Sequence, residues 1–252
     1  MKTISIINLK GGVAKTITSI NMAHILSSLY KKKVLLIDND KQGNTSKFFR
    51  VHSYDQPSIA DVLVERNYDI NNVIKKTEYE NLDIISANMN LLSANLKVIM
   101  DMSRQQQIIL RKALEQVQDK YDYCIIDNAP DINISVINAL VVSNEVIVPI
   151  KVDKFSFDGL DQLIDQFEDV KELNPSMNFR GCLITSFIKN DVNIQGEEYL
   201  NSQLKYPMFT THIRRTEKID ESTFARQPIT EYSHRCGAAK DYLTFMKEYL
   251  EE

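Results

Sequence analysis

The sequence contains few cysteines. Its three, Cys124, Cys182 and Cys236, are far apart. An odd number at such spacing supports neither a disulfide framework nor a CxxC metal site, and a reducing cytoplasm is the expected compartment. With 7 Gly and 6 Pro in 252 residues there is also no linker-like stretch and no internal repeat. We therefore expect a single domain over residues 1–252.

Long apolar runs and basic excess are missing as well. No run approaches the roughly 18 apolar residues that span a bilayer, and no membrane association is expected. The first strand begins almost at the N-terminus, which leaves no room for a signal peptide. The net charge is −4, so any contact with nucleic acid must come from a local basic patch.

The most informative stretch is residues 4–20, ISIINLKGGVAKTITSI. A short apolar run meets two glycines, then Lys15 and Thr16, then an apolar-periodic segment. This order predicts a strand, a tight turn and a helix start. Such a turn directs backbone N–H groups and the positive end of a helix dipole at one point, which suits a phosphate. Lys15 adds a positive charge for the outer phosphates, and Thr16 is placed to bind Mg²⁺.

The strict pattern G-x-x-x-x-G-K-[ST] is not met, because Leu9 and Ala14 stand at the glycine positions. The segment instead resembles the deviant Walker A motif, K-G-G-x-G-K-[ST], of the ParA/Soj/MinD family of P-loop ATPases. Lys10 matches the family's signature lysine, and the alternative is a turn that binds nothing. We expect Ala14 to have a negative φ, which lets alanine replace glycine and preserves nucleotide binding. The resemblance implies an ATP contact over Lys10, Gly11, Gly12, Val13, Ala14, Lys15, Thr16 and Ile17.

A second motif follows the apolar run Val34 to Asp38, which has the composition of a strand buried on both faces. It reads Asp38-Asn39-Asp40-Lys41-Gln42-Gly43-Asn44 and resembles the family's D-x-D-P-Q-G-N, with Lys41 in place of proline. The resemblance implies that Asp40 orients or activates the attacking water and that Asp38 lies near the magnesium ion. The alternative is an ordinary turn, which Asp, Asn and Gly favour in any case.

A third motif, YDYCIIDNAP, covers residues 121–130. Its apolar residues Cys124, Ile125 and Ile126 predict a buried strand that ends in Asp127. It resembles the family's Walker B segment, D-x-x-x-x-D-x-P-P, whose final aspartate, Asp127 here, holds magnesium. Asp131 stands at the second proline of that pattern. It either adds charge near the metal or caps the following helix.

Elsewhere strands alternate with helices, which predicts an α/β fold: a doubly wound, mostly parallel β-sheet flanked by helices, the P-loop NTPase fold. Strands are expected at 81–86, 145–150, 180–187 and 208–210. Helices are expected at 21–30, 57–66, 70–76, 89–100, 104–118, 132–142, 157–170, 191–204 and 238–252. The last of these is expected to pack on the domain.

The C-terminal part carries a local basic surplus. Residues 205–240 hold seven Lys or Arg against four Asp or Glu. The segment resembles the family region that neighbours the adenine, with Ile213 and Arg214 at the nucleotide, and that lines a DNA-gripping face. Contacts of that kind reach phosphates and are sequence-independent and salt-sensitive. The alternative is a set of solvated surface charges. The candidate DNA contacts are Lys189, Arg214, Arg215, Lys218 and Arg235.

The family resemblance implies an ATPase that uses ATP and Mg²⁺, with Lys10, Lys15 and Asp40 as catalytic residues and Thr16, Asp38 and Asp127 around the metal. ATP would join two subunits into a homodimer, with Lys10 of one reaching the phosphates of the other. The dimer would bind DNA nonspecifically, associate with the nucleoid, and release it when a ParB-like centromere-binding protein stimulates hydrolysis. Two alternatives stay open: a switch that positions a protein cargo without DNA, and a nucleotide-binding protein that hydrolyses little ATP.

Overall fold

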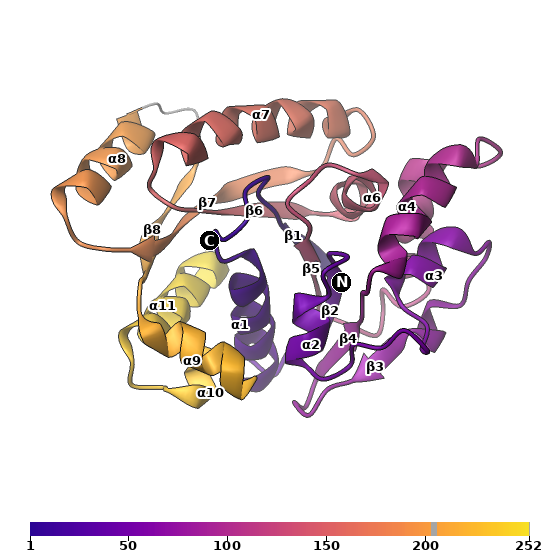
Figure 1. Cartoon of the computed structure of the whole chain (residues 1–252), viewed down its shortest axis with the longest axis horizontal. Helices are drawn as coiled ribbons and strands as arrows, with labels where there is room; N and C mark the ends of the chain where they lie inside the picture. Colours follow the sequence, from indigo (N-terminus) through magenta and orange to yellow (C-terminus); the bar gives the residue numbers. More distant parts are fainter. Residues whose placement is uncertain (203–205, 252) are drawn as a thin grey trace.

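A single β-sheet runs through the molecule (Figure 1). The computed structural model describes residues 1–202 and 206–251. The eight strands have the order β3-β4-β2-β5-β1-β6-β7-β8, and every neighbouring pair is parallel except β3 with β4. The strands are β1 (Lys2–Ile6), β2 (Val34–Asn39), β3 (Ile74–Lys76), β4 (Leu82–Ile85), β5 (Tyr123–Asn128), β6 (Glu145–Ile150), β7 (Asn178–Phe187) and β8 (Met208–Arg214).

Helices cover both faces of the sheet, as predicted for a doubly wound fold (Figure 1). One face carries α1 (Lys15–Ser28), α2 (Asn44–Phe48), α9 (Glu217–Ala225), α10 (Ile229–Tyr232) and α11 (Gly237–Glu251). The other carries α3 (Ile59–Val64), η1 (Ile70–Asn72), α4 (Asn90–Met100), η2 (Gln106–Ile108), α5 (Ile109–Glu115), α6 (Ile134–Val142), α7 (Lys154–Lys171) and α8 (Asp191–Ser202).

Alternation along the strands explains this arrangement. In β2, Leu36 belongs to the core cluster that includes α1 on one face, whereas Leu35 and Ile37 belong to the cluster that includes α3, α4 and α5 on the other. Every residue of β2 is buried. A continuous apolar run is what a parallel strand covered on both sides requires, because its successive side chains point to opposite faces.

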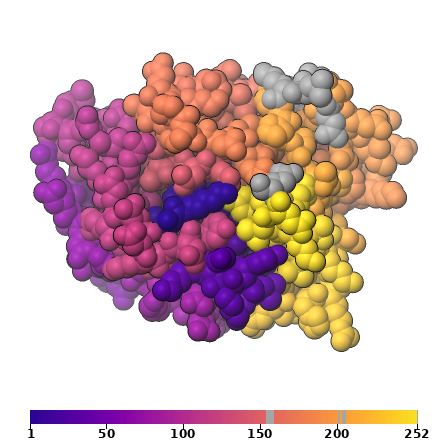
Figure 2. Space-filling view, turned by 180° about the vertical axis from the view of Figure 1, so that it is seen from behind, coloured from indigo at the N-terminus to yellow at the C-terminus, as the bar shows by residue number. Residues whose placement is uncertain are grey.

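The two ends of the chain lie side by side (Figure 2), where the N-terminal segment surfaces against the C-terminal helix. Lys2 forms an ion pair with Glu145 at 2.7 Å, and its Nζ lies 5.1 Å from the ring centre of Tyr249 in α11. The Tyr249 hydroxyl donates to Glu145 at 2.7 Å. Helix α11 is thus packed on the sheet, as expected for the C-terminal segment.

Two predicted helices differ in the structure. The segment 70–76 forms η1 and then β3, an antiparallel strand at the edge of the sheet. The predicted helix 104–118 is shorter, because η2 and α5 together cover only residues 106–115. The strand expected at 208–210 continues to Arg214. The ends of the helices predicted to reach 204 and 252 lie outside the described residues.

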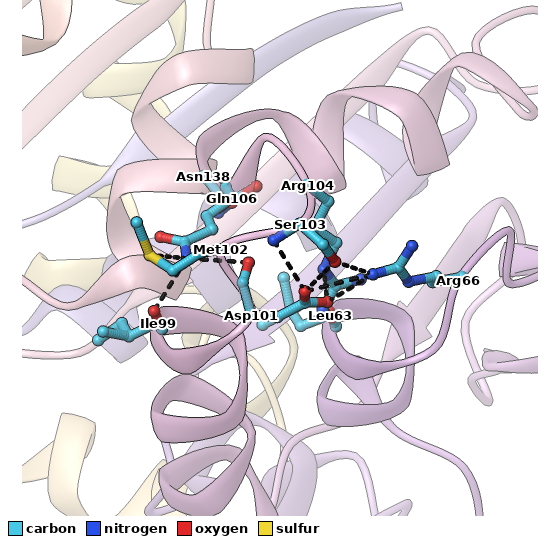
Figure 3. Close-up of polar contacts among 9 residues, drawn as sticks. All are labelled: Leu63, Arg66, Ile99, Asp101, Met102, Ser103, Arg104, Gln106 and Asn138. Carbon is cyan, nitrogen blue, oxygen red and sulfur yellow. Dashed lines mark hydrogen bonds and ion pairs between the residues drawn. The ribbon is translucent and has the colours of Figure 1, made fainter.

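A polar network at the periphery joins the segment after α3, the turn after α4 and η2 (Figure 3). Arg66, just after α3, donates to both carboxylate oxygens of Asp101 at 3.1 and 3.2 Å and also to the Ser103 hydroxyl. Arg104 Nε lies 3.1 Å from the same carboxylate. Gln106 Nε2 donates to the Ile99 and Asp101 carbonyls at 2.9 and 3.1 Å. These contacts fix the turn after α4 by side-chain bonds at the surface.

All three cysteines are free thiols. Cys124 and Cys182 are buried in β5 and β7, and burial raises the pKa of both thiols. Cys236 is half-buried at the start of α11. Within residues 1–202 and 206–251 no helix combines the length and apolar character needed to cross a membrane.

Candidate functional site

The turn between β1 and α1 is anchored to its neighbouring strands. Asn8, which is buried, donates from Nδ2 to the Pro149 carbonyl at 2.9 Å, and its Oδ1 accepts from the Lys10 amide at 2.9 Å. The Thr185 hydroxyl donates to the Val13 carbonyl at 3.1 Å. Residues from β6 and β7 therefore set the shape of this loop.

The loop contains two residues in the left-handed region, Gly12 with φ +73° and Ala14 with φ +64°. The prediction that Ala14 has a negative φ is wrong. Ala14 precedes the helix as its N-terminal cap residue, outside the helical backbone, and the turn into α1 needs a left-handed residue there. This explains why the motif normally has glycine at the position. This conformation costs alanine about 1 kcal/mol or more in the free energy of folding.

Lys15 begins α1 and bends back over the loop, where its Nζ donates to the Lys10 carbonyl at 2.7 Å. Lys15 is only 8% exposed. Burial lowers its pKa, against the attraction of Asp127, Asp40 and Asp131. Its ammonium group therefore lies buried at the phosphate-binding turn, in the field of three nearby carboxylates.

Lys10 lies at the outer side of the same turn. Its Nζ is 3.3 Å from Asp153 Oδ1, and the Lys10 side chain is 27% exposed. The Lys10 alkyl chain also passes close to Gly159 in α7, within 3.7 Å of the position that a Cβ would occupy. The two lysines of the motif are thus separated into a buried one and an accessible one.

Three hydroxyls converge on Asp127 at the end of β5. Thr16 Oγ1 donates to Asp127 Oδ2 at 2.8 Å and Thr45 Oγ1 donates to the same oxygen at 2.6 Å. Ser19 Oγ donates to Oδ1 at 3.3 Å. Burial raises the pKa of Asp127 to about 6, although the hydrogen bonds from Thr45 and Thr16 act in the other direction.

Asp38 lies beside Asp127, because the two face each other across the paired strands β2 and β5. It accepts from the Ser46 amide at 2.8 Å, the Ser46 hydroxyl at 2.6 Å and the Asp40 amide at 3.2 Å. Burial and the charge of Asp127 raise its pKa to about 7. The structure therefore places Asp38 beneath the loop, holding the backbone that carries Asp40.

Asp40 is only partly buried, and its Oδ1 accepts from the Gln42 amide at 2.9 Å. The loop closes through a bond from the Gly43 amide to the Asp40 carbonyl at 2.8 Å. Gly43 has φ +64°, and a Cβ there would lie 2.7 Å from the Ala87 carbonyl oxygen. Glycine is needed at this position for both reasons.

A donor set of this kind fits a magnesium ion. Hydroxyl and carboxylate oxygens are the ligands that Mg²⁺ takes from proteins, together with substrate phosphates and water. The Thr16 hydroxyl and the Asp127 carboxylate are already in contact, at the point where the phosphate-binding turn meets β5. A cation there would also favour the ionised form of the two carboxyl groups whose pKa burial raises.

Several residues at the site were not predicted. Thr45 and Ser19 bind Asp127, and each is close in sequence to a motif residue. Lys151 was missed as well, although its Nζ lies only 4.0 Å from the position of a Cβ on Gly12. The available signal was its place directly after β6, next to β1 in the sheet, since the carboxyl ends of parallel strands meet at one edge.

The predicted adenine residues are Ile213 and Arg214, at the end of β8. The Ile213 side chain is 1% exposed and packs in the core, as Ile17 does in part, so only the backbone of Ile213 is left to contact a ligand. Arg214 forms a bidentate ion pair with Asp241, in which Nε and Nη2 each lie 2.7 Å from a carboxylate oxygen. Its side chain lies over Gly237, where a Cβ would be 2.4 Å from Arg214 Cδ.

A groove of about 730 Å³ brings together three of the five predicted DNA contacts, Lys189, Arg214 and Arg215. Lys218 and Arg235 do not line it. Lys218 is bound to Glu221 at 2.6 Å instead. The groove is also lined by Phe187, Ile188, Thr210, Thr211, His212, Asp241 and Thr244.

Comparison with known proteins agrees with this geometry. Residues 1–179 match a family model described as an AAA domain. The chain is 35% identical to the sporulation initiation inhibitor protein Soj of Bacillus subtilis, over 98% of this chain and 97% of that protein. It is 31% identical to the chromosome-partitioning ATPase Soj of Treponema pallidum, over 99% and 97% of the two chains.

Solved structures show the same fold. A putative plasmid partition protein of Borrelia burgdorferi bound to AMPPNP superposes with a TM-score of 0.79 at 27% identity, covering 99% of each chain. The Cyanothece McdA–ATP complex superposes with a TM-score of 0.88 at 18% identity, covering 99% of this chain and 96% of that one. With the lysine-framed glycine turn, the two aspartate motifs and whole-length relatives in agreement, the chain belongs to the ParA/Soj family of P-loop ATPases.

Proposed function

We propose that this protein is a Mg-ATP-dependent ATPase that dimerises on ATP binding, binds DNA nonspecifically and acts in plasmid, mobile-element or chromosome partitioning. The observation that carries the nucleotide part is the junction of Thr16 with the buried Asp127, beside the Lys15 ammonium. The partitioning role rests on similarity to the Soj and plasmid partition proteins named above.

Each residue of the site has a role in this proposal. Lys15 and the backbone amides of the turn stabilise charge that develops on the transferred phosphoryl group. Thr16 and Asp127 would hold magnesium, which neutralises phosphate charge, and Asp38 fixes the loop beneath them. Asp40, the partly buried carboxylate of that loop, orients the attacking water. Lys10, whose side chain is accessible, would reach the nucleotide of the second subunit.

Hydrolysis is tested by single-turnover rates of wild type and Asp40→Ala with ATP in place. We expect Asp40→Ala to be slower by about 10²-fold, the usual size of a general-base or water-positioning effect. Asp83→Ala is a suitable control, because Asp83 binds Lys76 and Tyr121 near the amino ends of β4 and β5, at the opposite end of the strands from Asp40 and Asp127. Equal rates for wild type and Asp40→Ala would remove Asp40 from the mechanism.

DNA binding is proposed for the groove lined by Lys189, Arg214 and Arg215. The test is a salt titration of binding to random duplex DNA, with and without ATP. Phosphate contacts predict ATP-dependent affinity that falls steeply with salt, and Arg215→Ala should weaken binding and reduce the salt slope by about 1. Lys218→Ala is the matched control, since Glu221 already pairs with Lys218. No binding at low salt would contradict the proposal.

The second candidate is an ATPase switch that positions a protein cargo without a DNA role. What favours it is the pairing of two candidate DNA contacts with acids, Arg214 with Asp241 and Lys218 with Glu221, together with the net charge of −4. Under this alternative ATP hydrolysis persists and duplex DNA does not bind.

In the first proposal a ParB-like centromere-binding protein stimulates slow hydrolysis, and the cytoplasmic protein associates with the nucleoid when it holds ATP.

A further inference from the structure

The loops after β2 and β5 are joined by an ion pair at two unusual positions. Lys41 Nζ lies 3.7 Å from Asp131 Oδ2, and the side chains are 36% and 48% exposed. Both residues stand where the motifs of the family have proline. Two departures from the pattern, about 90 positions apart in the sequence, have therefore introduced opposite charges that meet in space.

The sheet explains why they meet. Strands β2 and β5 are neighbours with Asp38 opposite Asp127 and Asn39 opposite Asn128, so the loops leave the sheet side by side. Asn39 Nδ2 donates to Asn128 Oδ1 at 2.8 Å, and the Ala129 amide donates to the Asn39 carbonyl at 3.3 Å. The two loops are thus already held together by buried contacts, and an exposed ion pair adds little to that connection.

The electrostatic position of Asp131 is more informative. Asp131 follows the end of β5 by three residues, at the same carboxyl ends of the strands as Asp127. The charge of Asp131, with those of Asp127 and Asp40, also raises the pKa of the Lys15 ammonium against the effect of burial. A carboxylate that attracts Lys15 repels a phosphate bound by Lys15, because the sign of the charge is reversed. Asp131 by itself would therefore weaken phosphate binding, and Lys41 is the cation that the structure places against it.

We propose that Lys41 and Asp131 form a charge-compensating pair, in which Lys41 cancels the repulsion of Asp131 for the outer phosphate and so sets the affinity for ATP. This inference rests on the proposed function, since it concerns phosphates bound at the same site. Lys41 and Asp131 are positioning residues: they act through the field at the phosphates. The effect is larger for ATP than for ADP, because ATP adds a phosphate and a further negative charge.

The test is a double-mutant cycle of Lys41→Gln and Asp131→Asn, with the equilibrium affinity for a non-hydrolysable ATP analogue and for ADP as readouts. We expect Lys41→Gln to weaken analogue binding by about two- to fivefold and Asp131→Asn to strengthen it by a similar factor, the scale of an exposed pair. The double variant should return close to wild type. High salt should shrink all of these differences.

Changes of opposite sign in the nucleotide affinity of the two single variants distinguish charge compensation from an ion pair that only holds the two loops together. Equal weakening by both single variants, with no recovery in the double variant, would overturn the proposal, and so would unchanged affinity in Lys41→Gln. Lys171→Gln is the matched control, because it removes the charge of an exposed pair with Glu168 on α7. If the wild type binds neither nucleotide, the proposed function itself fails. If the wild type and all variants bind the analogue with equal affinity, only the proposal about Lys41 and Asp131 fails.

Discussion

Two carboxylate centres of this molecule have opposite electrostatics. At the carboxyl ends of β2 and β5, Asp38 and Asp127 are fully buried, and burial raises the pKa of each. At the periphery, Asp101 lies among Ser103, Arg66 and Arg104, and hydrogen bonds from Ser103 and Arg66 lower its pKa (Figure 3). The first centre is arranged at a cost in stability, whereas the second is paired as ordinary surface groups are. Such a contrast is typical of a functional site beside a structural one.

The largest expected effect comes from breaking the buried centre. Asp127→Asn removes the carboxylate that contacts Thr16, Thr45 and Ser19. We expect at least about a 10²-fold loss of Mg-dependent ATP hydrolysis, as for other groups that stabilise transition-state charge. Thermal stability without nucleotide should not fall, because a buried charge is removed. A variant that keeps its ATPase rate would contradict the metal-binding role.

Next in size is the pH dependence of stability. Asp38 and Asp127 have raised pKa values in the folded state, about 7 and about 6, so the folded protein binds more protons than the unfolded chain between about pH 4 and 7. Stability from these groups is therefore present at low pH and is lost as pH rises through that window, on the order of 3–4 kcal/mol for each group.

Denaturant unfolding of the nucleotide-free protein at pH 5 and pH 7.5 measures this loss. The Asp38→Asn variant provides the comparison, because it should flatten the difference between the two pH values. A slope that is the same in wild type and Asp38→Asn would show that Asp38 is not protonated in the folded protein at pH 5.

A smaller effect on stability is expected from backbone conformation at the nucleotide-binding turn and at the peripheral network around Asp101. Ala14 at the nucleotide turn and Asn67 beside Arg66 have nearly the same left-handed conformation, with φ +64° and +56°. Asparagine adopts that region at little cost, whereas alanine adopts it only at a cost in free energy. We expect Ala14→Gly to raise the free energy of unfolding by about 1 kcal/mol, and Asn67→Gly to change it by a few tenths. Equal gains in denaturant unfolding would refute the strain assigned to Ala14.

Breaking the peripheral centre should have the smallest effect. Asp101→Asn removes the shared partner of Arg66, which is exposed, and of Arg104, whose side chain is only 15% exposed. We expect Tm to fall by about 1–2 °C and ATP affinity to stay within error of wild type, because the pair with Arg66 is partly exposed and asparagine keeps an oxygen that can accept from the arginines. A marked loss of nucleotide affinity would mean that the α3–α5 layer is coupled to the site.

The sequence was sufficient for the parts of the fold that depend on local pattern. Buried strands such as Val34–Asp38 and Cys124–Asp127 were predicted because an unbroken apolar run before an aspartate is typical of a parallel strand. The segment 70–76 was misassigned, because β3 is fixed by pairing with β4 across the turn and has no alternating pattern of its own. Tertiary pairing decides such short segments.

At the site, motif spacing located Lys15, Thr16 and Asp127, which the structure joins. It could not give the φ of Ala14, which depends on how the loop is anchored by Asn8 and Thr185. Lys151 and Thr45 were not predicted as site residues, because their contacts with the site depend on strand order and helix placement. Long-range neighbours of that kind carry no signal in a single sequence.

The three thiols have a practical consequence for experiments on the basic groove. Cys124 and Cys182 are buried in the sheet, so the half-buried Cys236 is the cysteine left for a thiol-reactive fluorophore in the native protein. Cys236 precedes Gly237, over which Arg214 lies, and Arg214 lines the groove. The wild-type chain thus carries a single built-in attachment point for a reporter whose emission follows what enters the groove.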